Sequence, residues 1–164
     1  MNKVTAKQLK DRAKEYKEWE YSPEGIHYRF GGLYGINDPQ LESIFFTTLS
    51  KLPKEVVDLA EKTLFSWGDA LTESYIIKSH SLKDFKAIVI LYNSLRKKPL
   101  RKIEEIIAHE IAHVYLKHDW GFKHNLDREL EADELASKWL GHKITHYTNL
   151  VKKLNKSQHA VSKK

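Results

Sequence analysis

The chain has 164 residues, of which 41% are hydrophobic and 30% are charged, and it contains no cysteine. This length and balance are typical of one soluble globular domain, and the lack of cysteine excludes a disulfide-built fold and metal sites made of thiolates. No apolar run is long enough to span a bilayer, and the first residues do not form a signal segment. We therefore expect a cytoplasmic protein without a membrane partner.

Hydrophobic residues at helical spacing predict most of the elements. The first expected helix is a packing helix with Tyr16 and Trp19 on its apolar edge, and the second has an apolar face that continues to Trp67. Proline favours the first turn of a helix, so two helices are expected to begin at prolines. The predicted helices cover residues 5–19, the residues after Pro53, those after Pro99, 127–140 and 144–154.

Alternating apolar and polar residues predict the strands. A short strand is expected at 26–30, within a stretch that glycine and proline punctuate. Two further strands are expected at 74–78 and 85–92, joined by a polar turn. Strands and helices therefore mix along the chain, which predicts an α+β fold.

The net charge of +6 raises the question of a nucleic-acid partner. The excess of lysine and arginine is concentrated at residues 96–102 and in the C-terminal segment 143–164. A basic tail of this kind is most often solvated, and no aromatic residues are interleaved with the basic ones. Nucleic-acid binding therefore stays open as an alternative function.

The sequence His-Glu-Ile-Ala-His at residues 109–113 is the strongest chemical signal. On a helix, residues four apart lie on one face about 5–6 Å apart, so His109 and His113 can reach one ion while Glu110 reaches beside it. Their stripe is otherwise apolar, which predicts that both rings point inward. The alternative is a pair of core histidines that hydrogen-bond to the backbone. Two histidines and an acid together favour a metal site.

A second helix places two acids on its apolar face. Glu129 and Asp133 share a helical stripe with two alanines and a leucine, and burying carboxylates there is costly without a cation or donors. Glu129 is therefore the expected third ligand, while Asp133 is expected to accept the Nδ1 hydrogen of a metal-bound histidine. Two imidazoles and one carboxylate leave a fourth position open, as in catalytic zinc sites. The alternative is a solvated helix whose acids pair with Arg128 and Lys138.

An HExxH helix followed by a helix with ExxxD resembles the gluzincin metallopeptidases, and the two parts here are HEIAH and ELEAD. The surroundings of the second part resemble the ImmA/IrrE-type minimal metallopeptidases and, less closely, a membrane-associated family of the same clan. The resemblance covers about residues 83–140. The short connector before Glu129 leaves Glu131 as an alternative ligand.

The resemblance implies a minimal zincin-like domain, with a small, mostly antiparallel sheet packed on helices that include the HExxH helix. The strand at 87–92 would form the edge of a cleft, where an extended peptide substrate pairs with it. We expect a single metallopeptidase-like domain over 1–142, with its core at about 53–141, and a basic C-terminal helix or tail over 143–164.

The predicted function is zinc-dependent hydrolysis of peptide bonds through a zinc-bound water, with Glu110 as general base and one Zn²⁺ per chain. The partner would be a protein or peptide substrate. The alternatives are a non-proteolytic metal-binding regulator of the same fold and a basic nucleic-acid-binding protein with an incidental HExxH. Six side chains are chemically able to stabilise the oxyanion, and the sequence does not choose among them: Tyr115, His118, His124, His142, His146 and Tyr147.

Overall fold

The computed structural model describes residues 6–30, 38–68, 74–77, 87–118 and 125–144. Helices make up most of these residues, and three short strands form one sheet. None of the described helices is of a length and apolarity that would let it cross a bilayer. The elements are α1 (Ala6–Glu20), α2 (Pro23–Phe30), α3 (Pro39–Leu49), α4 (Lys54–Glu61), β1 (Thr63–Gly68), β2 (Ser74–Ile77), β3 (Ala87–Tyr92), the 3₁₀ helix η1 (Asn93–Lys97), α5 (Leu100–Tyr115) and α6 (Leu126–Leu140).

The sheet is mixed, with the strand order β1-β3-β2. β1 runs parallel to β3, from Thr63 opposite Ala87 to Gly68 opposite Tyr92. β2 pairs with the other side of β3 in the antiparallel sense. The prediction of an α+β fold with a mostly antiparallel sheet is therefore wrong, because the described chain is predominantly helical and its longer strand pairing is parallel. The strand at 87–92 was expected at the edge of the sheet, but it is the central strand.

The residues of β1 were predicted to be helical, and the end of α4 shows why this prediction is wrong. The apolar pattern after Pro53 was expected to continue as a helix to Trp67, but α4 ends at Glu61. Thr63 lies just after it and donates its hydroxyl hydrogen to the carbonyl oxygen of Leu59 at 3.1 Å. Two of the next residues, Phe65 and Trp67, are of the aromatic type that favours strands, and the buried Phe65 packs in the core. Tertiary packing beside β3 thus overrides the helical periodicity.

The predicted strand at 26–30 is also wrong, because these residues belong to α2. Ser22 begins this helix, and its hydroxyl accepts a hydrogen bond from the backbone N–H of Gly25 at 3.1 Å. Pro23 then occupies the first turn, where its missing N–H does no harm. The pair Ser22-Pro23 was a helix-start signal that outweighs a five-residue alternation.

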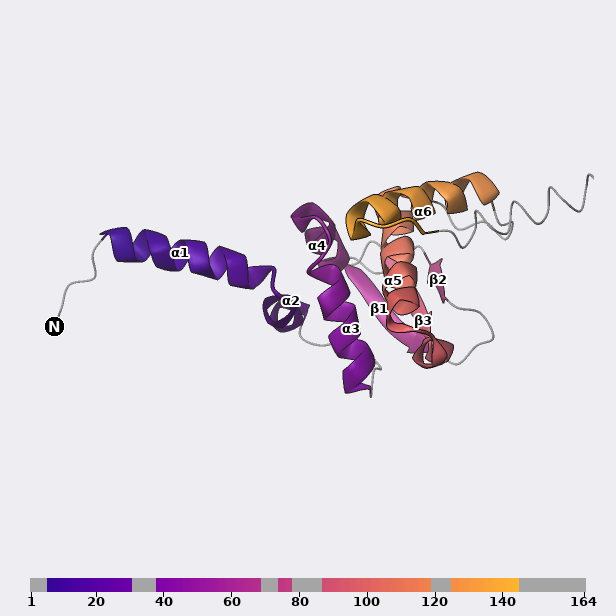
Figure 1. Cartoon of the computed structure of the whole chain (residues 1–164), viewed down its shortest axis with the longest axis horizontal. Helices are drawn as coiled ribbons and strands as arrows, with labels where there is room; N and C mark the ends of the chain where they lie inside the picture. Colours follow the sequence, from indigo (N-terminus) through magenta and orange to yellow (C-terminus); the bar gives the residue numbers. More distant parts are fainter. Residues whose placement is uncertain (1–5, 31–37, 69–73, 78–86, 119–124, 145–164) are drawn as a thin grey trace, which may run out of the picture.

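The hydrophobic core surrounds α5. Figure 1 shows α5 lying along one face of the sheet, with α3 and α4 on one side and α6 across it. Contacts between α5 and its neighbours α6, α3, α4, β2 and β3 agree with this view. Phe45, Phe65, Leu91, Ile107 and Ile111 are almost fully buried, and each such side chain contributes roughly 1.5–3 kcal/mol. The best-packed helix of the protein is therefore the one that carries the HExxH sequence.

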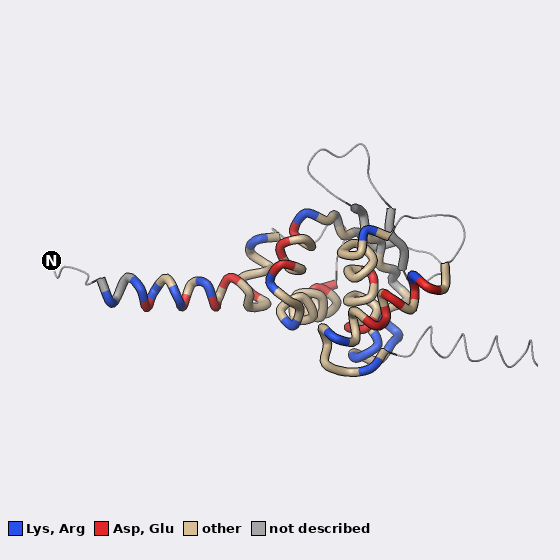
Figure 2. Tube along the Cα trace, turned by 90° about the horizontal axis from the view of Figure 1, so that it is seen from above, with Lys and Arg blue, Asp and Glu red and all other residues tan. Residues whose placement is uncertain are grey.

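The first helix projects away from this body (Figure 1). The expected packing of its apolar edge on the core is not seen, because Tyr16 and Trp19 are exposed and contact one another and Tyr28 of α2. Lysines, arginines and acids alternate along α1, as Figure 2 shows. The predicted helix at 144–154 and the tail lie outside the described residues, apart from 143 and 144.

Gly25 sets the approach of α2 to the end of α1. A Cβ atom at this position would overlap the backbone carbonyl of Trp19. Gly25→Ala is expected to lower the free energy of unfolding by about 1–2 kcal/mol, because the overlap outweighs the roughly 1 kcal/mol that alanine gains over glycine in a helix. Urea unfolding followed by circular dichroism measures this. The exposed neighbour Glu24→Ala is the control, expected to stay within about 0.5 kcal/mol of the parent, and an equal or higher stability of Gly25→Ala would contradict the prediction.

Candidate metal centre

The HExxH residues are buried because α5 is covered on several sides. The helix begins after Pro99, and its apolar residues from Ile103 to Ala112 face the sheet and the neighbouring helices. The side chains of His109 and Glu110 lie within this covered stretch, where the residues are only 6% and 9% exposed. His113, one turn further, is half-buried. Polar groups placed in such surroundings require partners.

The second helix, α6, supplies these partners. Asn125 begins it, and the Asn125 side chain accepts a hydrogen bond from the backbone N–H of Asp127 at 3.0 Å. Ala132 and Ala136 are fully buried, and these small side chains let α6 pack closely against α5. Glu129 lies in the first turn, where the helix dipole favours a negative charge. The packing of the two helices thus brings the Glu129 carboxylate towards the histidines.

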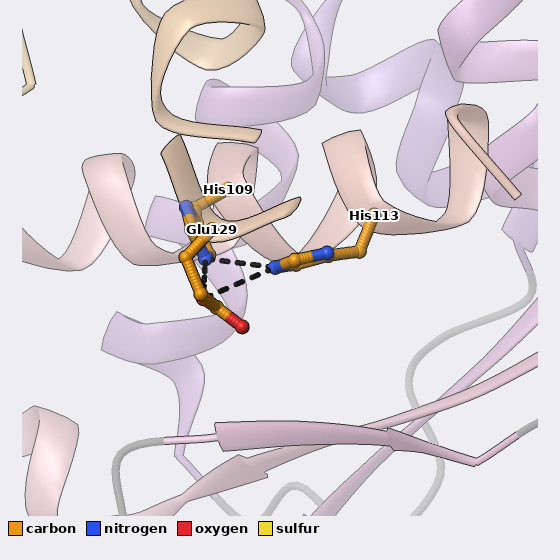
Figure 3. A group of neighbouring side chains, drawn as sticks. All are labelled: His109, His113 and Glu129. Atoms are coloured by element: carbon orange, nitrogen blue, oxygen red, sulfur yellow. Dashed lines mark hydrogen bonds and ion pairs between the residues drawn. The ribbon is translucent and has the colours of Figure 1, made fainter. Parts of the chain in front are cut away.

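Three of the predicted ligands lie together. Nε2 of His109 is 3.1 Å from Oε2 of Glu129 and 3.0 Å from Nε2 of His113, and the distance from His113 Nε2 to Glu129 Oε2 is 3.4 Å. Figure 3 shows these three atoms converging on one point between α5 and α6. Within the described chain this is the group of side chains with the spacing to hold a metal ion, its ligand atoms all within 4.8 Å.

The geometry fits a small tetrahedral cation. Two ligand atoms bound about 2.0–2.1 Å from a tetrahedral zinc ion lie about 3.3 Å from each other. The three measured separations, 3.0, 3.1 and 3.4 Å, scatter around this value. Two imidazole nitrogens that face each other at 3.0 Å repel unless a proton or a metal ion lies between them. The donor set is also one that zinc prefers, with two imidazoles and a carboxylate.

Asp133 contacts the other nitrogen of His109. Its Oδ1 accepts a hydrogen bond from Nδ1 of His109 at 3.0 Å, and both side chains are buried. This contact fixes the ring so that Nε2 faces Glu129. Glu134, on an exposed face of α6, pairs with Lys138 instead. The solvated-helix alternative therefore describes Glu134, and it does not describe Glu129 or Asp133.

The electrostatics reflect this cluster of charges. Burial by itself lowers the pKa of His109, but hydrogen bonds to Asp133 and Glu129, with the charge of Glu110, outweigh it and raise the pKa to about 9. Burial pushes the pKa of Glu129 upward, yet the hydrogen bonds and charges of His109 and His113 hold it well below its usual range. The site thus stabilises positive charge at its centre.

His118 and Glu131 lie beside His113, in a set of contacts that the sequence did not indicate. Nδ1 of His118 lies 2.8 Å from Nδ1 of His113, and Nε2 of His118 lies 3.1 Å from Oε2 of Glu131. Glu131 is therefore directed to His118, and Glu129 is the carboxylate that lies between the two HExxH histidines. Burial lowers the pKa of His118, and Glu131 offsets this in part. The sequence analysis had named both residues for other roles, Glu131 as an alternative ligand and His118 among the side chains able to stabilise the oxyanion.

The other side chains considered for oxyanion stabilisation do not converge on this point. Tyr115 is exposed and packs edge-on against the ring of Trp139. Nε2 of His142 lies 3.3 Å from Oε1 of Glu105, which precedes His109 by four residues on α5. The remaining candidates lie outside the described residues: His124, His146 and Tyr147.

In a comparison with models of known protein families, residues 49–161 match the family described as Peptidase U49. The match includes the sheet, α5 and α6, and leaves out α1, α2 and nearly all of α3. Corresponding comparisons with curated proteins and with solved structures give no match.

Proposed function

The chain belongs to the Peptidase U49 family, and on that premise we propose that it is a zinc-dependent metallopeptidase of the gluzincin type. The observation that carries the proposal is the convergence of Nε2 of His109, Nε2 of His113 and Oε2 of Glu129 within 4.8 Å. These residues would hold the ion, and Asp133 would orient His109. When bound, zinc supplies Lewis-acid polarisation of the scissile carbonyl and activation of a water molecule.

Glu110 is the proposed general base and acid. It follows His109 on α5 and lies close enough for its charge to raise the pKa of His109. A carboxylate beside the metal position can take a proton from water and later deliver it to the leaving amine. Its burial keeps it away from bulk solvent, which strengthens its electrostatic interactions with the site.

The substrate is proposed to be an extended peptide segment of a protein. Within the described residues β2 forms one edge of the sheet, and it contacts α5. An edge strand offers backbone N–H and C=O groups to which an extended peptide adds as a further strand. The peptide is therefore proposed to pair with β2. The sequence had indicated β3 for this role, but β3 is the central strand and already pairs with a strand on each side.

A nucleic-acid-binding function is less well supported. Basic residues of η1 and of the first turn of α5 pair with acids: Arg96 lies 2.9 Å from Asp38, and Arg101 and Lys102 both contact Glu105. Figure 2 shows acidic residues in red mixed with the basic ones in blue along α1. A surface that binds phosphates needs an excess of positive charge on one face.

The proposal is tested by measuring the zinc content of the purified protein after exhaustive dialysis, beside Glu129→Ala and Glu134→Ala. We expect one zinc per chain in the parent protein. Removing the carboxylate ligand in Glu129→Ala should weaken zinc binding by at least about 100-fold, because two imidazoles alone hold the ion poorly. Glu134→Ala removes an exposed acid of the same helix and should keep the metal. A parent protein that takes up no zinc would overturn the proposal.

A further inference from the structure

The ring of His113 is contacted from both sides. Its Nε2 faces His109 and Glu129, and its Nδ1 lies 2.8 Å from Nδ1 of His118. An imidazole that binds a metal through Nε2 carries its hydrogen on Nδ1. His113 would then donate this hydrogen to Nδ1 of His118. The hydrogen of His118 is in turn on Nε2, which donates to Oε2 of Glu131 at 3.1 Å.

The turn that ends α5 holds His118 in this place. The backbone N–H of Lys117 donates to the carbonyl of Val114 at 3.2 Å, and that of His118 donates to the carbonyl of His113 at 3.0 Å. These two bonds form a Schellman motif, whose left-handed residue is usually glycine. Here it is Lys117, with φ of +57°, a conformation that costs a non-glycine residue about 1 kcal/mol. The turn folds His118 back so that its ring lies 5.0 Å from that of His113.

The two HExxH histidines are thus held in similar ways by different groups. Asp133 accepts directly from Nδ1 of His109, whereas His113 reaches the carboxylate of Glu131 through the ring of His118. We propose that His118 and Glu131 form a positioning pair that orients His113 as a metal ligand. This inference rests on the proposed function, and it assigns a role to two residues that bind neither the metal nor the substrate.

The two members of the pair contribute unequally. The side chain of His118 is 11% exposed, and it keeps Nε2 of His113 directed at Glu129. The side chain of Glu131 is 59% exposed, so water screens its attraction. Outer partners of this kind typically change metal affinity by 10- to 100-fold. We expect His118 to account for most of such an effect and Glu131 for a few-fold change.

Zinc affinity, measured by competition with a chromophoric chelator, tests the pair. His118→Leu removes the acceptor at similar size, and His118→Asn retains an acceptor, since its Oδ1 is as far from Cβ as Nδ1 of histidine is. We expect His118→Leu to bind zinc 10- to 100-fold more weakly and His118→Asn to recover most of this loss. Glu131→Ala should weaken binding a few-fold, and Glu134→Ala should leave it unchanged. Cobalt substitution supplies a second measurement, because a reoriented His113 shifts the visible absorption of bound Co²⁺.

The outcomes separate this inference from the proposed function. Two results would overturn the positioning pair and leave the peptidase proposal intact, provided that the parent protein binds zinc. In the first, the zinc affinity of His118→Leu lies within about threefold of the parental value. In the second, His118→Asn binds zinc as weakly as His118→Leu. A parent protein without zinc would overturn both. Circular dichroism of metal-free His118→Leu shows whether it folds. If it does not, the exposed Glu131→Ala variant decides, and an unchanged zinc affinity and cobalt spectrum in that variant would overturn the pair.

Discussion

For the proposed zinc peptidase, Glu110→Gln is expected to reduce peptide-bond hydrolysis by about 10³-fold without loss of zinc binding. Glutamine has nearly the same shape as glutamate, so the packing of this buried position on α5 is retained. The amide cannot accept a proton from water, and it cannot deliver one to the leaving amine. The three proposed ligand atoms belong to other residues and are untouched by the change.

The measurement pairs cleavage of fluorescently labelled casein with the zinc content of the same preparations. Glu134→Gln is the matched control, because it makes the same chemical change at an exposed position of α6 where the partner is Lys138. It should cleave at the parental rate. A Glu110→Gln protein that cleaves as fast as the parent, with zinc bound, would rule out Glu110 as the proton carrier and favour another residue near α5.

The parts of the site that the sequence predicted are those that depend on one helix at a time. His109 and His113 lie on one face of α5 because four residues make slightly more than one helical turn. Glu129 and Asp133 are distinguished from their acidic neighbours by the buried alanines at 132 and 136, which mark the side of α6 that packs on α5. The ligand predictions therefore depended on helical spacing and on the apolar residues that share a face with each predicted ligand.

The parts that the sequence missed depend on contacts between distant segments or on unusual backbone. The parallel pairing of β1 with β3 joins residues 63–68 to 87–92, and no local pattern encodes such a pairing. The contact of His118 with His113 requires a left-handed Lys117, which residue preferences disfavour. Ser22 and Pro23 are residue types that favour the start of a helix, here α2. The alternation of apolar and polar residues at 26–30 led to the prediction of a strand instead.

The metal-free protein is expected to lose stability as the pH rises from about 6.5 to about 9. The pKa of His109 is raised to about 9 in the folded chain, above the value of 6.5 for an unperturbed histidine. Protonated His109 therefore favours the folded state, fully at pH values below 6.5, and this contribution disappears as the pH approaches 9. A difference of this size corresponds to on the order of 3 kcal/mol. The lowered pKa of Glu129 reflects the same contact and adds no second contribution in this pH window.

Urea unfolding of the chelator-treated protein at pH 6.5, 7.5 and 9 measures this loss, with His109→Gln as the control whose curve should be nearly flat. Zinc should reverse the trend, because the ion and the proton compete for Nε2 of His109, so that zinc affinity rises over the same interval. A metal-free protein whose stability does not change between pH 6.5 and 9 would show that Asp133 and Glu129 do not hold a charged His109. Stability of the metal-free protein is thus expected to fall with pH, while zinc affinity rises. Both trends have one cause, because Asp133, Glu129 and Glu110 surround His109 with negative charge that either a proton or a metal ion can balance.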